Sequence, residues 1–123
     1  MASAHETSRL ISADKVEGTA VYNISGDKVG NIKNVMIDKE SGKVAYATMA
    51  SGGIMGMGSD YFALPWNALT YNTDIGGYRL DVDKNKLEGA PAASEDNLVH
   101  DLEDQNFGSK VHDFYGTRPY WQQ

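Results

Sequence analysis

Histidines are the first residues of this sequence to consider for metal binding or acid–base chemistry, because imidazole serves both. There are three, scattered at His5, His100 and His112. No two are spaced as a helical pair, and His100, although followed by Asp101, fits a solvated acidic face better than a cation site. The chain has no cysteine, which excludes thiolate metal sites, cysteine nucleophiles and disulfides. We therefore expect no metal and no cofactor.

One segment imitates the start of a calcium-binding loop. Residues 81–85 are Asp-Val-Asp-Lys-Asn, but Lys86 stands at the position that needs glycine and Ala92 at the position that needs glutamate. A strand end followed by a capped turn is the better interpretation. The motifs Gly-x-Ser-x-Gly and His-Glu-x-x-His are absent, and no Ser-x-x-Lys is followed by its partner motifs. We therefore do not expect an enzyme.

A glycine-rich stretch over residues 51–60 suggests at first a phosphate-binding loop. It matches neither Gly-x-Gly-x-x-Gly nor Gly-Lys-Ser/Thr, and it leads into a predicted strand rather than a helix N-terminus. Its apolar residues Ile54, Met55 and Met57 either close one end of the fold or form a contact surface, since methionine adapts to irregular partners. If the loop is a self-interface, Met55→Asp and Met57→Asp should shift the oligomer toward monomer in light scattering.

Length and charge restrict the remaining classes of protein. A chain of 123 residues fits one domain, and its formal net charge of −6 argues against nucleic acid, whose phosphates require a basic face. No apolar run approaches the roughly 20 residues of a membrane span. The polar start also lacks the features of a secretory signal. We expect a cytoplasmic protein with no nucleic-acid partner and no direct membrane insertion.

The charge also divides the chain into two parts. Residues 1–91 carry nine basic and eleven acidic side chains, whereas residues 92–123 carry two basic and six acidic ones. The change falls at residues 89–93, a glycine, a proline and three alanines, which are typical of a linker. We expect a flexible N-terminus over residues 1–8, a globular body over residues 9–91 and an acidic, aromatic extension over residues 92–123.

Short β-strands are predicted throughout the body. Six runs have strand character and are separated by turns: residues 19–24, 29–38, 43–50, 61–65, 70–72 and 78–82. The second run loses its alternation near Gly30 and Asn34, as a bulged strand does. No helix is long enough to connect parallel strands, and closure removes exposed edges, so the pattern predicts an all-β fold, a small antiparallel β-barrel. The extension is predicted to form short helices, one opening at Ser94 and one ending at Gly116.

The order and spacing of these segments resemble the PRC-barrel family. This family includes the β-barrel module of the photosynthetic reaction-centre H subunit and of a ribosome maturation factor. Residues 112–121 are also similar to the C-terminal extension of small stand-alone bacterial members. The resemblance implies a compact β-barrel used for protein contact, and it assigns no catalytic residue, because the family has none in common. The matching segments are Gly-Thr-Ala-Val-Tyr-Asn (residues 18–23), Gly-Asp-Lys-Val-Gly-Asn-Ile (26–32), Met-Ile-Asp (36–38), Gly-Lys-Val-Ala-Tyr-Ala (42–47), Phe-Ala-Leu-Pro-Trp (62–66) and Leu-Asp-Val (80–82).

The aromatic residues of the extension need a surface on which to pack. They lie in an acidic segment that cannot form a core of its own, and burial of such rings stabilises a protein by about 1.5–3 kcal/mol each. We expect them to dock on their own barrel or on another subunit, so deleting residues 92–123 should lower thermal stability or disrupt assembly. The residues are Phe107, Phe114, Tyr115, Tyr120 and Trp121.

Together with the resemblance, these observations predict a non-catalytic interaction or assembly module. We expect it to form a homo-oligomer and to contact an unknown protein, which could belong to a membrane-associated complex. The alternative is a small-molecule-binding protein with a cavity at the barrel mouth, near the glycine-rich loop and Trp66, and an unrecognised enzyme is the third interpretation. The candidate interaction residues are Ile54, Met55, Met57, Trp66, Phe114, Tyr115, Tyr120 and Trp121.

Overall fold

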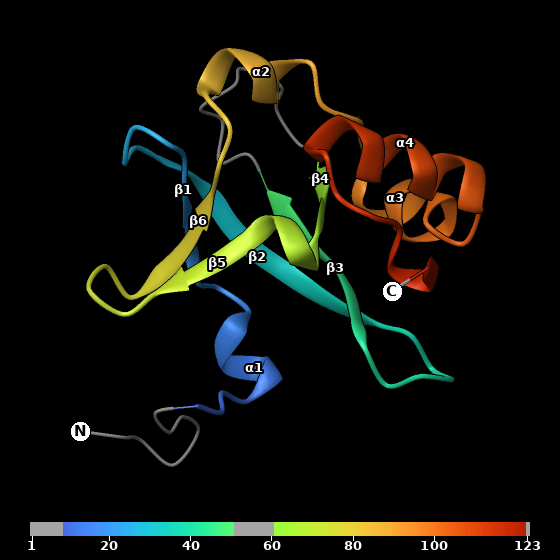
Figure 1. The fold of residues 1–123 in the computed structure, drawn as a ribbon, viewed down its shortest axis with the longest axis horizontal. Helices are drawn as coiled ribbons and strands as arrows, with labels where there is room; N and C mark the ends of the chain where they lie inside the picture. The colour runs from blue at the N-terminus through green and yellow to red at the C-terminus, as the bar shows by residue number, and fades with distance from the viewer. Residues whose placement is uncertain (1–8, 51–60, 123) are drawn as a thin grey trace.

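A curled β-sheet forms the body of the molecule (Figure 1). The computed structural model describes residues 9–50 and 61–122, so the candidate contacts Ile54, Met55 and Met57 lie outside the described residues. The strands follow one another in the sheet in the order β5-β6-β1-β2-β3-β4-β7. Their bounds are β1 Ala20–Tyr22, β2 Lys28–Ile37, β3 Val44–Ala50, β4 Tyr61–Pro65, β5 Leu69–Asn72, β6 Gly77–Leu80 and β7 Ala92–Ala93.

Short helices surround this sheet. The helix α1 (Ala13–Val16) precedes β1, the 3₁₀ helix η1 (Trp66–Ala68) joins β4 to β5, and α2 (Lys84–Glu88) follows β6. The C-terminal helices lie together beside β3 and β4 (Figure 1); they are α3 (Glu95–Asp101), α4 (Gln105–Tyr115) and the 3₁₀ helix η2 (Tyr120–Gln122). Among the described residues, no helix has the length and apolar character needed to cross a membrane.

The strand pairing corrects two features of the predicted barrel. Strand β1 pairs with β6 in parallel, through Val21 with Tyr78 and Tyr22 with Arg79, so the sheet is mixed rather than antiparallel. The antiparallel prediction was wrong because it assumed that parallel strands need a long connecting helix. In the structure, strands β2 to β5 connect β1 to β6. Within the described residues no ladder joins β5 to β7, and the sheet is not closed into a hydrogen-bonded ring. It is strongly rolled, because only η1 separates β4 from β5, which lie near opposite ends of the strand order.

Strand β2 is irregular, as its sequence indicated. Its register against β3 shifts between Ile32 and Asn34, which confirms the bulge predicted near Asn34. At Gly30, a Cβ atom would collide with the carbonyl oxygen of Ala50 at the end of β3. Glycine is therefore required where β2 passes this carbonyl group.

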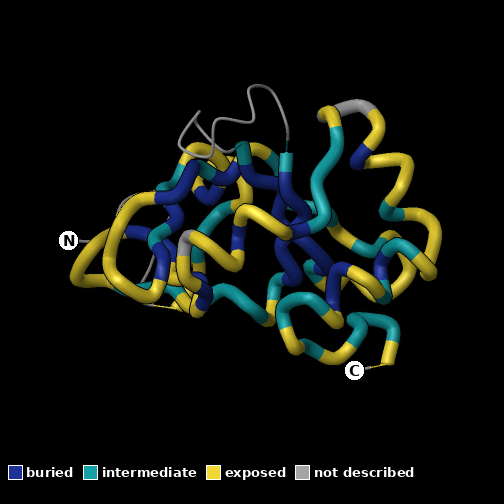
Figure 2. Tube along the Cα trace, turned by 90° about the horizontal axis from the view of Figure 1, so that it is seen from above, coloured by how far each residue is buried: buried dark blue, intermediate teal, exposed yellow. Residues whose placement is uncertain are grey.

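Buried side chains form two clusters, one on each face of the sheet. The inner core contains Val21, Val29, Ile32, Met49, Phe62, Leu64 and Leu80, with further residues around them. The outer cluster lies between the sheet and the C-terminal helices and consists of Ala45, Tyr46, Ala63, Leu98 and Val111. Strand β4 contributes to both, because alternate side chains of a strand point to opposite faces. Figure 2 shows the buried segments in the middle of the molecule and the exposed ones in its turns and helix ends.

The C-terminal extension docks on its own sheet. Strand β7, which falls in the predicted linker, pairs with β4. Helix α4 begins at Gln105, where the Asp104 carboxylate caps it by accepting a hydrogen bond of 2.8 Å from the Asn106 N–H. It ends at Gly116, whose φ of 68° is left-handed, as predicted for a glycine that terminates a helix.

Candidate functional site

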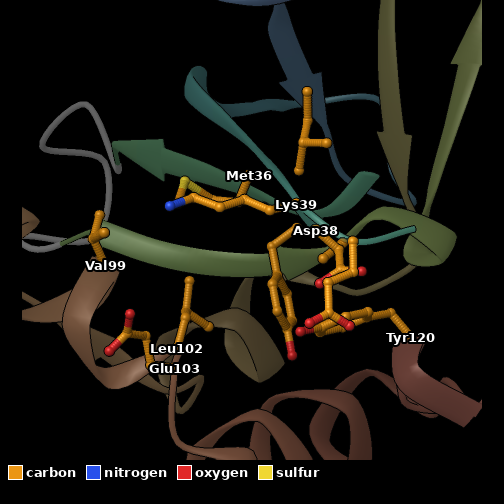
Figure 3. A pocket seen from close by; sticks show the side chains of 11 residues that line it. Met36, Asp38, Lys39, Val99, Leu102, Glu103 and Tyr120 are labelled. Atoms are coloured by element: carbon orange, nitrogen blue, oxygen red, sulfur yellow. The ribbon is translucent and has the colours of Figure 1, made fainter. Parts of the chain in front are cut away.

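A cleft opens on the outer side of the sheet, between the end of strand β2 and the C-terminal helices (Figure 3). We call it the outer cleft. Its volume is about 370 Å³, and its walls are residues 36–40, the end of α3 with the residues that follow it, and Tyr120 of η2. Ala45 and Tyr46 of β3 complete the lining. The outer cleft therefore brings together side chains from three distant parts of the sequence.

Apolar side chains make up much of this lining: Met36, Ile37, Val99 and Leu102. Ile37 is 52% exposed and Val99 is 36% exposed, and both belong to the few strongly exposed large apolar residues of the described chain. Neighbouring side chains of a regular strand point to opposite faces. The register of β2 shifts between Met36 and Ile37, and this irregularity accounts for both residues lining the same cleft.

Charged side chains also line the outer cleft. Asp38, Glu40 and Glu103 are acidic, and Lys39 is basic. In the part of the chain that the structure describes, none of the four has an ion-pair partner. Asp38 is held in place, since the Ser41 N–H donates a hydrogen bond of 2.9 Å to its carboxylate. Hydrogen bonds from the side chain and the backbone of Ser41 lower the pKa of Asp38, so its negative charge is stabilised.

Tyr46 stands at the back of the outer cleft. It is 2% exposed, and its hydroxyl has no hydrogen-bond partner among the described residues. Burial, together with the nearby Tyr120, raises the pKa of Tyr46 well above its usual range. Burial and the charge of Asp38 raise the pKa of Tyr120 as well. Both phenols therefore stay protonated at neutral pH and add no negative charge to the cleft.

His112 anchors the chain behind Tyr120. It is 1% exposed; its Nε2 accepts a hydrogen bond of 3.3 Å from the Tyr120 N–H, and its Nδ1 lies 2.8 Å from the Thr117 hydroxyl. Because a backbone N–H can only donate, Nε2 must be unprotonated and Nδ1 must carry the proton. Burial lowers the pKa of His112, and Asp113 opposes part of that effect. The structure thus holds a neutral imidazole in one tautomer, with both ring nitrogens engaged.

The structure places three of the predicted interaction residues against the inner core. Trp66, Phe114 and Tyr115 are partly buried and pack on it. The Trp66 ring lies 5.5 Å from that of Tyr78, and the Phe114 ring 5.0 Å from that of Tyr115. None of the three lines the outer cleft. Phe114 and Tyr115 of the extension thus pack on the same chain, one of the two surfaces that the sequence left open.

The other two predicted residues, Tyr120 and Trp121, pack around His112. Their ring centroids lie 6.3 Å and 5.7 Å from that of His112, and Tyr120 also contacts Tyr46 edge to face at 5.5 Å. Of the predicted interaction residues within the described chain, Tyr120 is the one that lines the outer cleft.

The apolar residues of the outer cleft were not identified from the sequence. Ile37 and Val99 occur in segments whose strand and helix patterns were recognised, but no local signal marked them as exposed residues of one cleft. The one available signal is the four-residue spacing of Leu98 and Leu102, which places both on one face of a helix. Leu98 is buried in the outer cluster and Leu102 lines the cleft.

The segment that imitates a calcium loop is a capped turn. The Asp83 carboxylate accepts a hydrogen bond of 2.7 Å from the Lys86 N–H and so caps α2. The Asp81 carboxylate pairs instead with Arg79 at 2.9 Å. Within residues 9–50 and 61–122, no three side chains of histidine or acidic residues converge as a metal site would require.

Comparison with known proteins identifies the family of the fold. The chain matches the family model of the PRC-barrel domain over residues 9–88, which is most of the sheet and more than half of the chain. None of the curated proteins matches the chain. The family match covers β1 to β6, whereas α3, α4 and η2, which complete the outer cleft, lie beyond it.

Proposed function

The chain belongs to the PRC-barrel family, and we propose that it serves as a non-catalytic protein-interaction module. One observation carries this proposal: two large aliphatic side chains, Ile37 and Val99, remain exposed in the lining of the outer cleft although the sheet has buried cores on both faces. Exposed apolar surface bounded by charged residues is typical of a protein contact site. Single exposed apolar residues are common on protein surfaces. Apolar residues from distant segments that line one cleft form a shared apolar surface, which is the more informative feature.

The surroundings of His112 and of the cleft carboxylates argue against a catalytic role. The buried histidine, His112, uses both ring nitrogens within the protein, so it has no free nitrogen for proton transfer to a substrate. The carboxylates of the outer cleft face a surface that is largely aliphatic, and Asp38 is held as an anion by Ser41. This arrangement suits recognition better than acid–base chemistry.

Site-specific photo-crosslinking tests the proposal directly. A photoreactive phenylalanine analogue replaces Ile37 or Val99, and it replaces Ile75 as the control, because Ile75 is similarly exposed at 45% but lies in the turn between β5 and β6. After irradiation in cells of the source organism, we expect protein adducts from positions 37 and 99 well above those from position 75. Equal yields from all three positions would contradict the assignment of the outer cleft as the contact surface.

We also propose that the chain forms homo-oligomers, and we do not assign this contact to the outer cleft. An adduct with twice the 13.4 kDa mass of the chain would identify a second copy, and any other mass a different protein. Sedimentation velocity over a range of concentrations measures the same property without labels, and we expect the average mass to rise with concentration. A single 13.4 kDa species throughout would exclude homo-oligomerisation.

Small-molecule binding is the second candidate, and the volume of the outer cleft supports it. About 370 Å³ falls within the range of small-ligand pockets. The cavity first expected near Trp66 has less support, since the described pocket beside η1 has a volume of about 190 Å³. A thermal-shift screen with metabolites tests this candidate: a ligand whose stabilising effect disappears in Val99→Asp but persists in Ile75→Asp would favour it.

A further inference from the structure

The charges of the outer cleft are unbalanced. The lining contains three carboxylates, those of Asp38, Glu40 and Glu103, but one ammonium group, that of Lys39, and none of the three carboxylates has an ion-pair partner among the described residues. Figure 3 shows Val99, Leu102 and Glu103 on one side of the cleft, with Asp38 and Tyr120 at the other end. An apolar surface thus lies between carboxylates on opposite sides.

We propose that the outer cleft binds a short segment of another protein in which apolar side chains are flanked by lysine or arginine. This inference rests on the proposed interaction function and specifies its partner. The apolar side chains would cover Ile37 and Val99, removing them from water. The cationic side chains would reach Glu40 and Glu103, which are exposed and able to move toward them. Complementary charge of this kind speeds association and selects among partners with similar apolar residues.

The same charges argue against a second copy of this chain at the cleft. A two-fold symmetric contact places identical patches against each other. Glu40 and Glu103 would then face another pair of carboxylates, with Lys39 as the single cation of the lining on each side. Like charges across an interface oppose association. A nucleic-acid partner is disfavoured for the same reason, since its phosphates would meet these carboxylates.

Selection from a display library of random short peptides tests the partner chemistry. The immobilised full-length protein is the bait, and a double variant, Glu40→Lys with Glu103→Lys, is used in parallel. The matched control, Asp74→Lys with Glu88→Lys, makes the same change of net charge at exposed residues outside the cleft. We expect the wild type and the control to enrich peptides with apolar residues between lysines or arginines.

Fluorescence anisotropy then measures the affinity of one enriched peptide. We expect the Glu40→Lys, Glu103→Lys variant to bind this peptide with an affinity at least about tenfold lower than that of the wild type. The control variant should bind within about twofold of the wild type, and added salt should weaken binding. Equal loss in the control variant would mean that net charge acts, not the cleft, and would overturn the inference.

The outcomes also separate this inference from the proposed function. Enrichment of neutral or acidic peptides whose binding is lost in Val99→Asp would refute the basic partner and leave the cleft as an interaction surface. Enriched peptides that bind Val99→Asp and wild type equally would refute both. Enrichment of segments of this chain's own sequence would identify a second copy and so refute the partner proposed here.

Discussion

At the scale of single residues, Tyr46 of the sheet packs closely against Gly108 of the C-terminal helix α4. A Cβ atom on Gly108 would lie 2.8 Å from the Tyr46 hydroxyl and 3.1 Å from two ring carbons of Trp121. Gly108 is inside α4, where glycine ordinarily costs about 1 kcal/mol relative to alanine. Close packing at this position therefore outweighs the low helix propensity of glycine.

A double-mutant cycle should reveal this contact. We expect Gly108→Ala to destabilise the wild type by about 1 kcal/mol, because overpacking costs about 1–3 kcal/mol and exceeds the gain in helix propensity. In a Tyr46→Phe background the nearest atom is absent, so Gly108→Ala should destabilise less, although the contact with Trp121 at 3.1 Å remains. Tyr46→Phe alone should change little, since the hydroxyl has no partner to lose. Urea denaturation of the four proteins gives the coupling; equal effects of Gly108→Ala in both backgrounds would refute it.

The neutral state of His112 makes stability depend on pH. Burial lowers the pKa of His112 in the folded protein below its ordinary value of 6.5, so the unfolded chain binds this proton at higher pH than the folded chain. The free energy of unfolding should then be complete above pH 6.5, decrease as the pH falls below 6.5, and level off below the folded pKa. The physical cause is burial, which removes the charged imidazolium from water.

Denaturation curves over this pH range test the dependence. Replacing His112 with glutamine should remove the decrease, whatever its effect on stability at neutral pH. His100→Gln is the matched control, because His100 is exposed on α3 and should leave the pH dependence unchanged. Retention of the full decrease in His112→Gln would assign it to other groups.

At the scale of elements, the interface between β3, β4 and the C-terminal helices binds the extension to the sheet. Leu98 of α3 and Val111 of α4 pack there with Tyr46, and all three are at most 2% exposed. The caps at Asp104 and Gly116 determine where α4 begins and ends, and its buried residues include Val111 and His112. The extension is thus a structural layer of the protein, and it supplies one wall of the outer cleft.

Two neighbouring residues of α3 should respond very differently to truncation. Leu98 is 1% exposed and Val99 is 36% exposed. We expect Leu98→Ala to destabilise the protein by about 2–5 kcal/mol, because it leaves a cavity. Val99→Ala should change stability by less than about 0.5 kcal/mol. Thermal denaturation followed by circular dichroism measures both, and similar effects of the two substitutions would mean that α3 does not dock as described.

At the scale of the whole molecule, the sheet is rolled but its strand pairing is open. The central strands β2 and β3 have partners on both sides, whereas β5 stands at one end of the strand order and β7 at the other. The acidic extension covers one outer face near β3 and β4, so the uneven charge of the sequence becomes an uneven charge of the surface. The carboxylate of Glu103 reaches the outer cleft by this route.

Hydrogen exchange should show this open topology. We expect the backbone amides of β2 and β3 to exchange slowest, at rates set by global unfolding, and those of β5 to exchange faster through local opening. Amide exchange followed by NMR resolves the strands individually. Protection of β5 equal to that of β3 would indicate that the sheet is closed by a further pairing.

Local patterns were sufficient to locate most elements. Alternating or β-branched runs predicted the strands, the irregularity near Asn34 predicted a bulge, and Gly116 predicted the end of a helix. The site was less accessible. Tyr120 was a predicted interaction residue and lines the outer cleft, but Ile37 and Val99 were missed. Exposure of an apolar residue depends on what packs over it, and adjacent sequence does not contain that information.

The sequence by itself determined the family, the strand-rich body and the separate character of the acidic extension, because these depend on local composition, spacing and turn residues. The tertiary structure alone decided the parallel pairing of β1 with β6, the docking of the extension on its own sheet and the position of the outer cleft. The physical reason is the range of the interactions. A turn or a cap is formed by neighbours in the chain, whereas a strand pair, a buried tyrosine or a cleft is formed by residues that only folding brings together.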